Sequence, residues 1–182
     1  MSESTSNLRR KLFVAAGIGA AVIGAGVSLG RRPAGPASLS SAAASFWNAR
    51  FDRPEGGELP AASFKGKPLL LNFWATWCPP CVKELPELAQ FEREFKGQGW
   101  QVLGLAIDSP SAVREFLKKL PLDFPLGLAG LTGTELTRTL GNTQGGLPFS
   151  VAFDVSGELI WRKLGATNLA ELRQMTGKLV AG

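Results

Sequence analysis

LLLNFWATWCPPCVKEL, residues 69–85, contains both cysteines of a 182-residue chain and changes its pattern halfway along. Residues 69–74 are an apolar run broken only by Asn72, which predicts a strand buried on both faces of a sheet. From Pro79 to Lys96 the apolar residues recur at helical spacing, at Val82, Leu85, Leu88, Phe91 and Phe95. The sequence therefore predicts a strand followed by a helix, with the two cysteines at the junction.

The cysteine pair is a poor candidate for a metal site or a structural cross-link. A structural zinc site takes four Cys or His ligands, and the chain has two Cys and no His, so only a site shared between chains would be left. A disulfide between Cys78 and Cys81 closes a very short loop, and stabilisation by loop closure falls with loop length. With 45% hydrophobic residues the chain can bury a core without disulfides. We therefore expect a redox function for the pair, with no metal and no cofactor beyond the disulfide itself.

The two thiols are expected to differ because they occupy different places in the helix. Cys78 precedes Pro79 and faces the positive end of the helix dipole and its unpaired N–H groups. In such motifs these features lower a thiol pKa from about 8.5 towards 7 or below. Cys81 lies one turn further in and is expected to be more buried and protonated. We therefore expect an outward-facing Cys78 thiolate that exchanges with disulfides and a Cys81 that resolves the mixed disulfide, while Pro79 and Pro80 stiffen the first turn.

The basic character of the chain comes from its N-terminal segment. Five of the 20 Lys and Arg residues lie in residues 1–32 together with one acidic residue, and the remainder carries 15 basic and 14 acidic residues. The sequence pI near 9.6 therefore gives no reason to expect nucleic acid as a partner of the folded domain.

Residues 1–30 are expected to be a signal or membrane anchor. Residues 12–30 are uncharged and mostly apolar, with basic residues on both sides, and at 1.5 Å per residue they suffice to cross a bilayer core of about 30 Å. An uncleaved anchor, a cleaved secretory signal with small residues at 42–44, and a twin-arginine signal at Arg9-Arg10 all stay open. Each places the domain outside the cytoplasm, either soluble in the periplasm or anchored in the inner membrane. Residues 31–45, rich in Pro, Ala, Gly and Ser, are expected to be a flexible linker.

Residues 46–182 are expected to form a single α/β domain, because strand-like and helix-like segments alternate along them. An edge strand at 45–51 and a partner within 58–64 are expected to form an N-terminal hairpin. Further strands are expected at 100–107, 127–128, 149–154 and 158–163, and helices at 111–120, 134–140 and from the cap residue Asn168 to near Val180. The last two strands read as a hairpin, so the predicted sheet is mixed.

The motif WATWCPPC after an apolar strand resembles the active site of the thioredoxin-fold superfamily. Pro86, five residues after Cys81, is similar to the proline that kinks the active-site helix of that superfamily. Gly146-Leu147-Pro148-Phe149 resembles the segment that carries its cis-proline. Within the superfamily, residues 46–75 and 81–86 are most similar to the TlpA/ResA-like group of exported, often membrane-tethered reductases. The resemblance covers residues 46–180.

This resemblance implies a thioredoxin fold, with a central mixed β-sheet flanked by helices and an extra N-terminal β-hairpin. It also implies that the Leu147–Pro148 bond is cis and lies beside the dithiol. Substrate proteins are then expected to contact five residues around the cysteine pair, namely Trp77, Pro79, Pro80, Leu147 and Pro148.

Asn72 marks a departure from thioredoxin, which has a proton-transferring aspartate at that position. In the ResA-like pattern a glutamate three residues after the second cysteine is implicated instead, and Glu84 occupies that place. Residues three apart share a helix face, so the resemblance implies that Glu84 accepts the proton of Cys81. From the pattern alone, a solvated surface glutamate is an equal alternative. Asp108 is expected to be a turn and surface residue.

The resemblance further implies a protein disulfide reductase that acts on oxidised cysteine pairs of exported proteins, such as those of cytochrome c or copper-site assembly. Its electrons would come from a membrane thiol–disulfide relay, and it would work as a monomer. Two alternatives stay open: a Cu(I)-handling chaperone, with both cysteines as soft ligands, and a thiol peroxidase.

Overall fold

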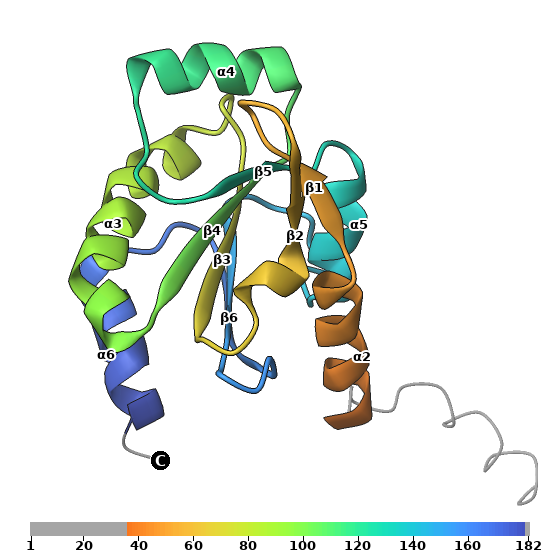
Figure 1. Cartoon of the computed structure of the whole chain (residues 1–182), viewed down its shortest axis with the longest axis vertical. Coiled ribbons are helices and arrows are strands. Elements are labelled where there is room, and N and C mark those ends of the chain that lie inside the picture. The colour runs from red at the N-terminus through yellow and green to blue at the C-terminus, as the bar shows by residue number, and fades with distance from the viewer. Residues whose placement is uncertain (1–35, 181–182) are drawn as a thin grey trace, which may run out of the picture. The chain divides into compact units, whose positions relative to one another are not determined.

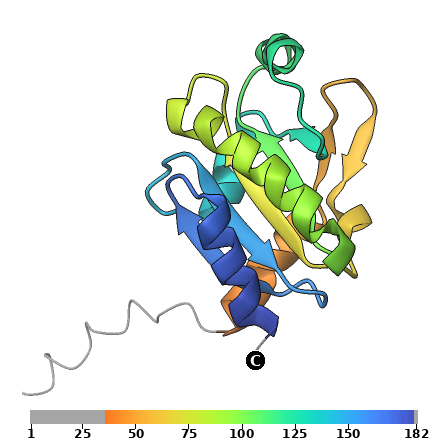
Figure 2. The ribbon, with the colours of Figure 1, turned by 90° about the vertical axis from the view of Figure 1, so that its left-hand side faces the viewer.

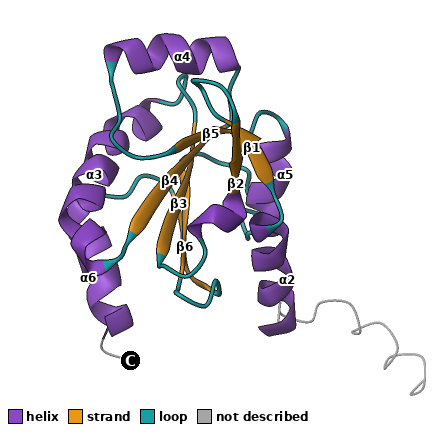
Figure 3. Cartoon of the chain, in the orientation of Figure 1, coloured by secondary structure: helices purple, strands orange, loops and turns teal. Residues whose placement is uncertain are grey.

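The computed structural model describes residues 36–180 (Figure 1). Helices and strands alternate along this part of the chain (Figure 3). Their bounds are α2 (Pro36–Trp47), β1 (Arg50–Asp52), β2 (Glu58–Pro60), η1 (Ala61–Phe64), β3 (Leu69–Trp74), α3 (Pro79–Phe95), η2 (Lys96–Gln98), β4 (Gln101–Ala106), α4 (Pro110–Lys119), β5 (Leu126–Leu128), α5 (Thr132–Thr139), β6 (Phe149–Phe153), β7 (Leu159–Leu164) and α6 (Leu169–Val180). The predicted α/β class is confirmed, and the elements from residue 69 onward lie within a few residues of their predicted positions.

Within the described residues the strands form one sheet in the order β2-β1-β5-β4-β3-β6-β7. The central strands β3, β4 and β5 are parallel, whereas β1 and β6 run antiparallel to their neighbours β5 and β3. The outer pairs β1–β2 and β6–β7 are also antiparallel, so the sheet is mixed, as predicted.

These strand directions bring four chain segments to the same end of the sheet, where β3, β4 and β5 finish. Trp74, Ala106 and Leu128, at the ends of β3, β4 and β5, lie level with one another across the parallel strands. Phe149, the first residue of the antiparallel strand β6, pairs with Phe73 of β3. The loops after β3, β4 and β5 and the loop before β6 therefore meet at this end, which is where open α/β sheets commonly place their functional sites.

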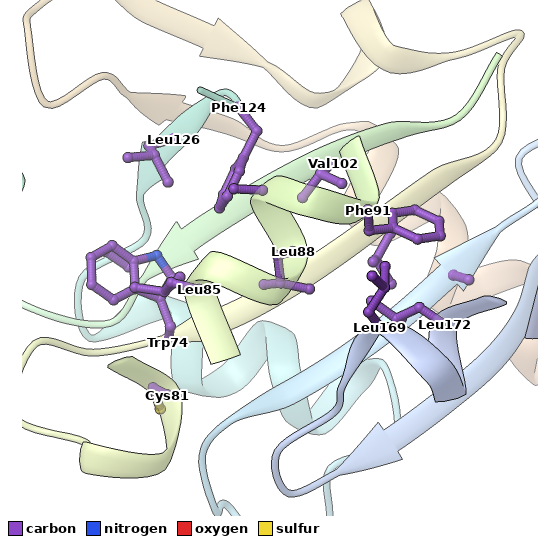
Figure 4. Close-up of a cluster of buried hydrophobic side chains, with 14 of the residues drawn as sticks. Trp74, Cys81, Leu85, Leu88, Phe91, Val102, Phe124, Leu126, Leu169 and Leu172 are labelled. Atoms are coloured by element: carbon purple, nitrogen blue, oxygen red, sulfur yellow. The ribbon is translucent and has the colours of Figure 1, made fainter. Parts of the chain in front are cut away.

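Helices cover both faces of the sheet. Helices α3 and α6 lie on one face and α2 and α5 on the other (Figure 1), and Figure 2 turns the α3–α6 face towards the viewer. A hydrophobic cluster fills the space between the sheet and the first of these layers (Figure 4); its labelled members are Trp74, Cys81, Leu85, Leu88, Phe91, Val102, Phe124, Leu126, Leu169 and Leu172. A second cluster on the opposite face includes Phe46, Phe73, Phe149 and Phe153.

The strand β3 and the helix α3 form where the sequence predicts them. All six residues of β3 are buried, as expected for a strand covered on both faces. Helix α3 begins at Pro79, and the side chains of Leu85, Leu88 and Phe91 are fully buried in the first cluster. Pro86 lies inside the helix.

Residues 36–45 depart from the prediction of a flexible linker, because they belong to the helix α2. The buried residues Ala42, Ala43, Phe46 and Trp47 recur at the spacing of one helical face. Phe46 stacks on Phe153 with ring centroids 4.9 Å apart, and the indole N–H of Trp47 donates to the carbonyl of Gly157 at 2.7 Å. The Ala and Ser composition that suggests a linker is equally compatible with a helix once this face is covered.

The N-terminal strands are also shorter than predicted. Residues 45–47, expected in an edge strand, complete α2, and β1 starts at Arg50. Its partner β2 covers Glu58–Pro60 only, because residues 61–64 form a 3-10 turn. Strand β2 rather than β1 is the edge of the sheet, since β1 also pairs with β5. The alternation in 45–51 misleads because Phe46 and Trp47 are adjacent and both buried, which a half-exposed strand does not allow.

None of the helices in the described part of the chain is both long enough and apolar enough to span a membrane. The expected signal or anchor at residues 1–30, and the first part of the expected linker, lie outside the described residues.

Candidate active site at the start of α3

The two cysteines lie at the junction of β3 and α3 and are joined by a disulfide bond. Their Cα atoms are 5.3 Å apart. Cys78 is the N-cap residue of α3, with an extended backbone, and its Sγ accepts a hydrogen bond from the amide of Cys81 at 3.3 Å. The predicted position of Cys78 at the start of the helix is therefore confirmed. A sulfur at an N-cap takes the place of the oxygen acceptors that usually satisfy the first amides of a helix.

Pro79 and Pro80 occupy the first two helical positions and supply no N–H groups. The amide of Val82 is already bonded to the carbonyl oxygen of Cys78 at 3.1 Å. Among the first residues of α3, Cys81 is therefore the one whose amide donates to the Cys78 sulfur. Because Pro79 and Pro80 have no N–H groups, the Cys78 sulfur receives one direct hydrogen bond, in addition to the effect of the helix dipole.

The two sulfurs differ less in exposure than predicted. Cys81 is fully buried, and Cys78 is only 4% exposed in the disulfide form, rather than facing outward. Cys78 packs in the first hydrophobic cluster, and its bond to the amide of Cys81 turns the sulfur towards the helix. The surface around it is open nevertheless, because Trp77, Pro79 and Pro80 are exposed. Trp74 is fully buried in the core, as predicted.

Glu84 is buried one turn below Cys81, which removes the alternative of a solvated surface side chain. Its Oε1 accepts a hydrogen bond from Nδ2 of Asn72 at 2.7 Å, and its Oε2 accepts one from the amide of Thr167 at 2.7 Å. Burial raises the pKa of Glu84 from 4.5 to about 7, and the hydrogen bonds from Thr167 and Asn72 and the charge of Lys163 oppose this rise. The carboxyl group can therefore bind or release a proton near neutral pH.

Polar partners hold Glu84 from the sheet and from the loop that precedes α6. On the sheet side, Nδ2 of Asn72 also donates to Oγ of Ser150, its register partner on β6, at 2.9 Å. On the other side, the hydroxyl of Thr167 donates to Oε2 of Glu171 at 3.2 Å, and Lys163 forms an ion pair with the same carboxylate. The sequence alone did not reveal Ser150, Thr167 or the Lys163–Glu171 pair, because they lie far from the motif along the chain.

Asp108 is more than the surface residue predicted from the sequence. It is half-buried, and its Oδ2 accepts hydrogen bonds from the amide and the hydroxyl of Thr76, at 2.9 and 2.6 Å. Its Oδ1 accepts from the amide of Ser109 at 2.7 Å. These bonds tie the loop after β4 to the loop that carries Trp77 and Cys78. Asp108 lies two residues after β4, at the same end of the sheet as the cysteines, and this position was the available signal.

A hollow of about 690 Å³ opens beside the cysteine pair, and we name it the Trp77 hollow. Its main side chains are Trp77, Ile107, Asp108, Leu131 and Leu147. Of the predicted substrate contacts, Trp77 and Leu147 line the hollow, and Pro79 and Pro80 are exposed on α3. The Leu147–Pro148 bond is cis, as predicted, whereas Pro148 itself is buried.

Comparison with known proteins agrees with this geometry. A family model described as Redoxin matches residues 43–177. Thiol-disulfide oxidoreductase ResA from Bacillus thuringiensis subsp. konkukian (strain 97-27) is 33% identical over 126 residues, which cover 69% of this chain and 70% of that protein.

Two solved structures extend the likeness to the fold. StoA from Bacillus subtilis has a TM-score of 0.58 and 26% identity, over 70% of this chain and 95% of that chain. A thiol:disulfide interchange protein of the thioredoxin family from Chlorobium tepidum TLS has a TM-score of 0.61 and 28% identity, over 71% and 91%. The matches and the cysteine pair at the start of α3 show that the chain belongs to the Redoxin family, as a thioredoxin-fold member of the TlpA/ResA-like thiol-disulfide oxidoreductases.

Proposed function

We propose that the chain is a protein disulfide reductase that acts outside the cytoplasm, with Cys78 and Cys81 as its redox-active pair and no further cofactor. The observation that carries this proposal is the position of the pair: a disulfide at the N-terminus of α3, one turn from a buried carboxyl group. A sulfur at this position is stabilised as a thiolate by the helix dipole and by the amide of Cys81.

The reaction starts from the dithiol form. The Cys78 thiolate attacks one sulfur of a substrate disulfide, forming a mixed disulfide and releasing the other substrate sulfur as a thiolate, which takes a proton from water. Cys81 then loses its proton and attacks the Cys78 sulfur. The Cys78–Cys81 disulfide forms, and the first substrate sulfur leaves as a thiolate. Two electrons have passed from the chain to the substrate.

Glu84 is the proposed acceptor of the Cys81 proton. It lies on the same face of α3 as Cys81, three residues further along, and both side chains are buried. With a pKa of about 7, Glu84 is partly ionised at neutral pH and can take the proton as the Cys81 sulfur attacks. In the reverse direction, when a donor reduces the disulfide, the same carboxyl group returns the proton.

The substrates that we propose are oxidised cysteine pairs of exported proteins, such as those of cytochrome c or copper-site assembly. Support comes from the likeness to ResA and from the apolar N-terminal residues 12–30, which suit an export signal or an inner-membrane anchor. A membrane thiol–disulfide relay is the proposed electron donor, because the disulfide must be reduced again after each turnover. The substrate is proposed to approach over Trp77, Pro79, Pro80 and Leu147, with the chain acting as a monomer.

A stoichiometric assay with the full chain tests the reaction. The reduced chain is mixed with a disulfide-containing peptide, and the products are identified by mass. We expect one peptide disulfide reduced per chain, a stable mixed disulfide on Cys78 in Cys81→Ser, and no reaction in Cys78→Ser. Equal trapping on Cys81 in the Cys78→Ser variant contradicts the assigned roles. The Cys81→Ser trap in the native envelope identifies the partner.

Equilibration in thiol buffers tests the direction. A reductase has a potential nearer to about −270 mV, as in thioredoxin, than to about −120 mV, as in DsbA. A potential at the oxidising end contradicts the proposal. A stable Cu(I) complex in the presence of competing dithiol, or steady turnover of peroxide, would favour the copper chaperone or the peroxidase instead.

A further inference from the structure

Leu131 has an unusual position for a leucine. It is 89% exposed, and Trp77 is 66% exposed, which makes them the two most exposed large hydrophobic side chains of the described residues. Both line the Trp77 hollow, Trp77 from the loop before α3 and Leu131 from the loop between β5 and α5. Two exposed apolar side chains on one hollow suggest that a partner covers them.

The loop around Leu131 is held in place by its own hydrogen bonds. The amides of Gly133 and Thr134 donate to the carbonyls of Ala129 and Leu131, at 3.0 and 3.1 Å, and the hydroxyl of Thr132 donates to the carbonyl of Ala129 at 2.8 Å. Gly130 has a positive φ of 54°, which aids the tight turn. The exposure of Leu131 is therefore fixed by the backbone, and ordering this loop costs little when a partner binds.

The hollow offers apolar surface and no basic side chain. Ile107 and Leu147 add to its apolar lining, and the backbone of Gly145 and Gly146 forms part of its wall. Asp108 is its one ionisable lining residue, and both carboxylate oxygens are already bonded to Thr76 and Ser109. The hydroxyl of Thr137 is bonded to the carbonyl of Thr134. An acidic side chain would lose its hydration here and would meet the negative charge of Asp108 without gaining a partner.

The position of the Trp77 hollow next to the cysteine pair indicates which partner covers it. Trp77 lines the hollow and directly precedes Cys78, so the chain of a substrate bound to Cys78 passes within reach of the hollow. The volume of about 690 Å³ is in the range of clefts that bind ligands, so the hollow has room for a large side chain. The substrate chain beside its attacked cysteine is thus the occupant that the geometry provides for.

We propose that Leu131 and Trp77 form a specificity clamp that selects substrates with a large, uncharged apolar side chain next to the attacked cysteine. This inference rests on the proposed function and adds the chemical class of the segment that the site accepts. Leu131 is a specificity-determining residue in this scheme and takes no part in thiol exchange itself.

The test compares two peptides that differ at one position. Both contain an oxidised cysteine pair, and the neighbour of the first cysteine is Phe in one and Ser in the other; hydroxyethyl disulfide serves as a substrate without a side chain. We expect a higher kcat/KM for the Phe peptide. Leu131→Ser should lower kcat/KM for the Phe peptide by roughly five- to thirtyfold, with changes within about twofold for the other two substrates. Leu131→Phe should retain the preference.

The matched control is Val155→Ser. Val155 is 64% exposed on the turn between β6 and β7 and does not line the hollow, so its substitution should leave all three rates unchanged. Equal rates for the two peptides, or an equal loss on all substrates in Leu131→Ser, overturn the clamp while leaving the reductase function in place. A wild-type chain that reduces none of the three substrates overturns the proposed function, and the clamp with it.

Discussion

Asn72 joins the middle of the sheet to the active-site helix, because its Nδ2 donates to Oε1 of Glu84 at 2.7 Å. Asn72 is fully buried in a strand that is otherwise apolar, and its Oδ1 has no hydrogen-bond partner in the described part of the protein. A buried, half-satisfied amide costs stability. The amide is therefore better explained by its action on Glu84, where its bond supports the ionised carboxylate against the effect of burial.

Asn72→Leu should raise the pKa of Glu84 above its value of about 7. Removing a donor to a charged group costs about 1.5–3 kcal/mol, which corresponds to a rise of about one to two pH units. The measurement is a pH titration of the carboxyl infrared band, assigned to Glu84 by its loss in Glu84→Gln. Thr176→Val, which removes a buried hydroxyl bonded only within α6, serves as the control. An unchanged titration midpoint in Asn72→Leu contradicts the role of the amide.

Glu84 should make the folded protein less stable as the pH rises. Its pKa is 4.5 ordinarily and about 7 in the fold, so the folded state binds more protons between these values. The stability that this provides is present below pH 4.5 and is lost as the pH rises through about 7; it amounts to about 3 kcal/mol. Urea unfolding of the disulfide form at several pH values, compared with Glu84→Gln, measures it. A difference between the two proteins that stays constant with pH refutes the buried, high-pKa carboxyl.

Phe46→Ala should destabilise the domain by about 3–5 kcal/mol, because it removes a fully buried ring that stacks on Phe153. Denaturant unfolding gives the value, with Ser40→Ala on the exposed side of α2 as the control. A loss below about 1 kcal/mol is what a flexible linker predicts, and it contradicts the packing of α2 on the sheet.

Pro80→Ala should increase the thiolate fraction of Cys78. The substitution adds an N–H at the second helical position, from which N-cap acceptors commonly receive a hydrogen bond. We expect the pKa of the Cys78 thiol to fall by roughly half a unit to one unit, measured by a pH titration of the ultraviolet absorbance of the thiolate. Pro79→Ala is the matched control, because an amide at the first position does not point at the N-cap side chain. Equal effects of both variants argue against a directed hydrogen bond.

The sequence predicts the parts of the fold whose pattern is local. The apolar run of β3, the spacing of α3 and the cysteine pair between them need no distant information, and each is found in place. Helix α2 escapes prediction because its buried face is recognisable only once Phe153 and Gly157 are known to lie beside it. The composition of residues 36–45 then suggests a linker.

In the candidate site, too, the local features can be predicted from the sequence and the features that depend on distant residues cannot. Glu84 can be placed three residues from Cys81 from the sequence, but its burial depends on Thr167, 83 positions away, and on Ser150 behind Asn72. Leu131 could not be predicted as a site residue, because an isolated leucine near a turn forms no recognisable sequence pattern. Its position beside Trp77 follows only from the parallel strands, which bring its loop to the same end of the sheet.

Alkylation of the reduced chain over a range of pH measures whether the start of α3 makes Cys78 the reactive thiolate. We expect iodoacetamide to label Cys78 and to leave the buried Cys81 unlabelled, with a rate that rises with pH to a plateau and a midpoint below the value of about 8.5 for a free thiol. If Cys78 stays unlabelled after reduction, or reacts only above the free-thiol midpoint, it is not the reactive thiolate.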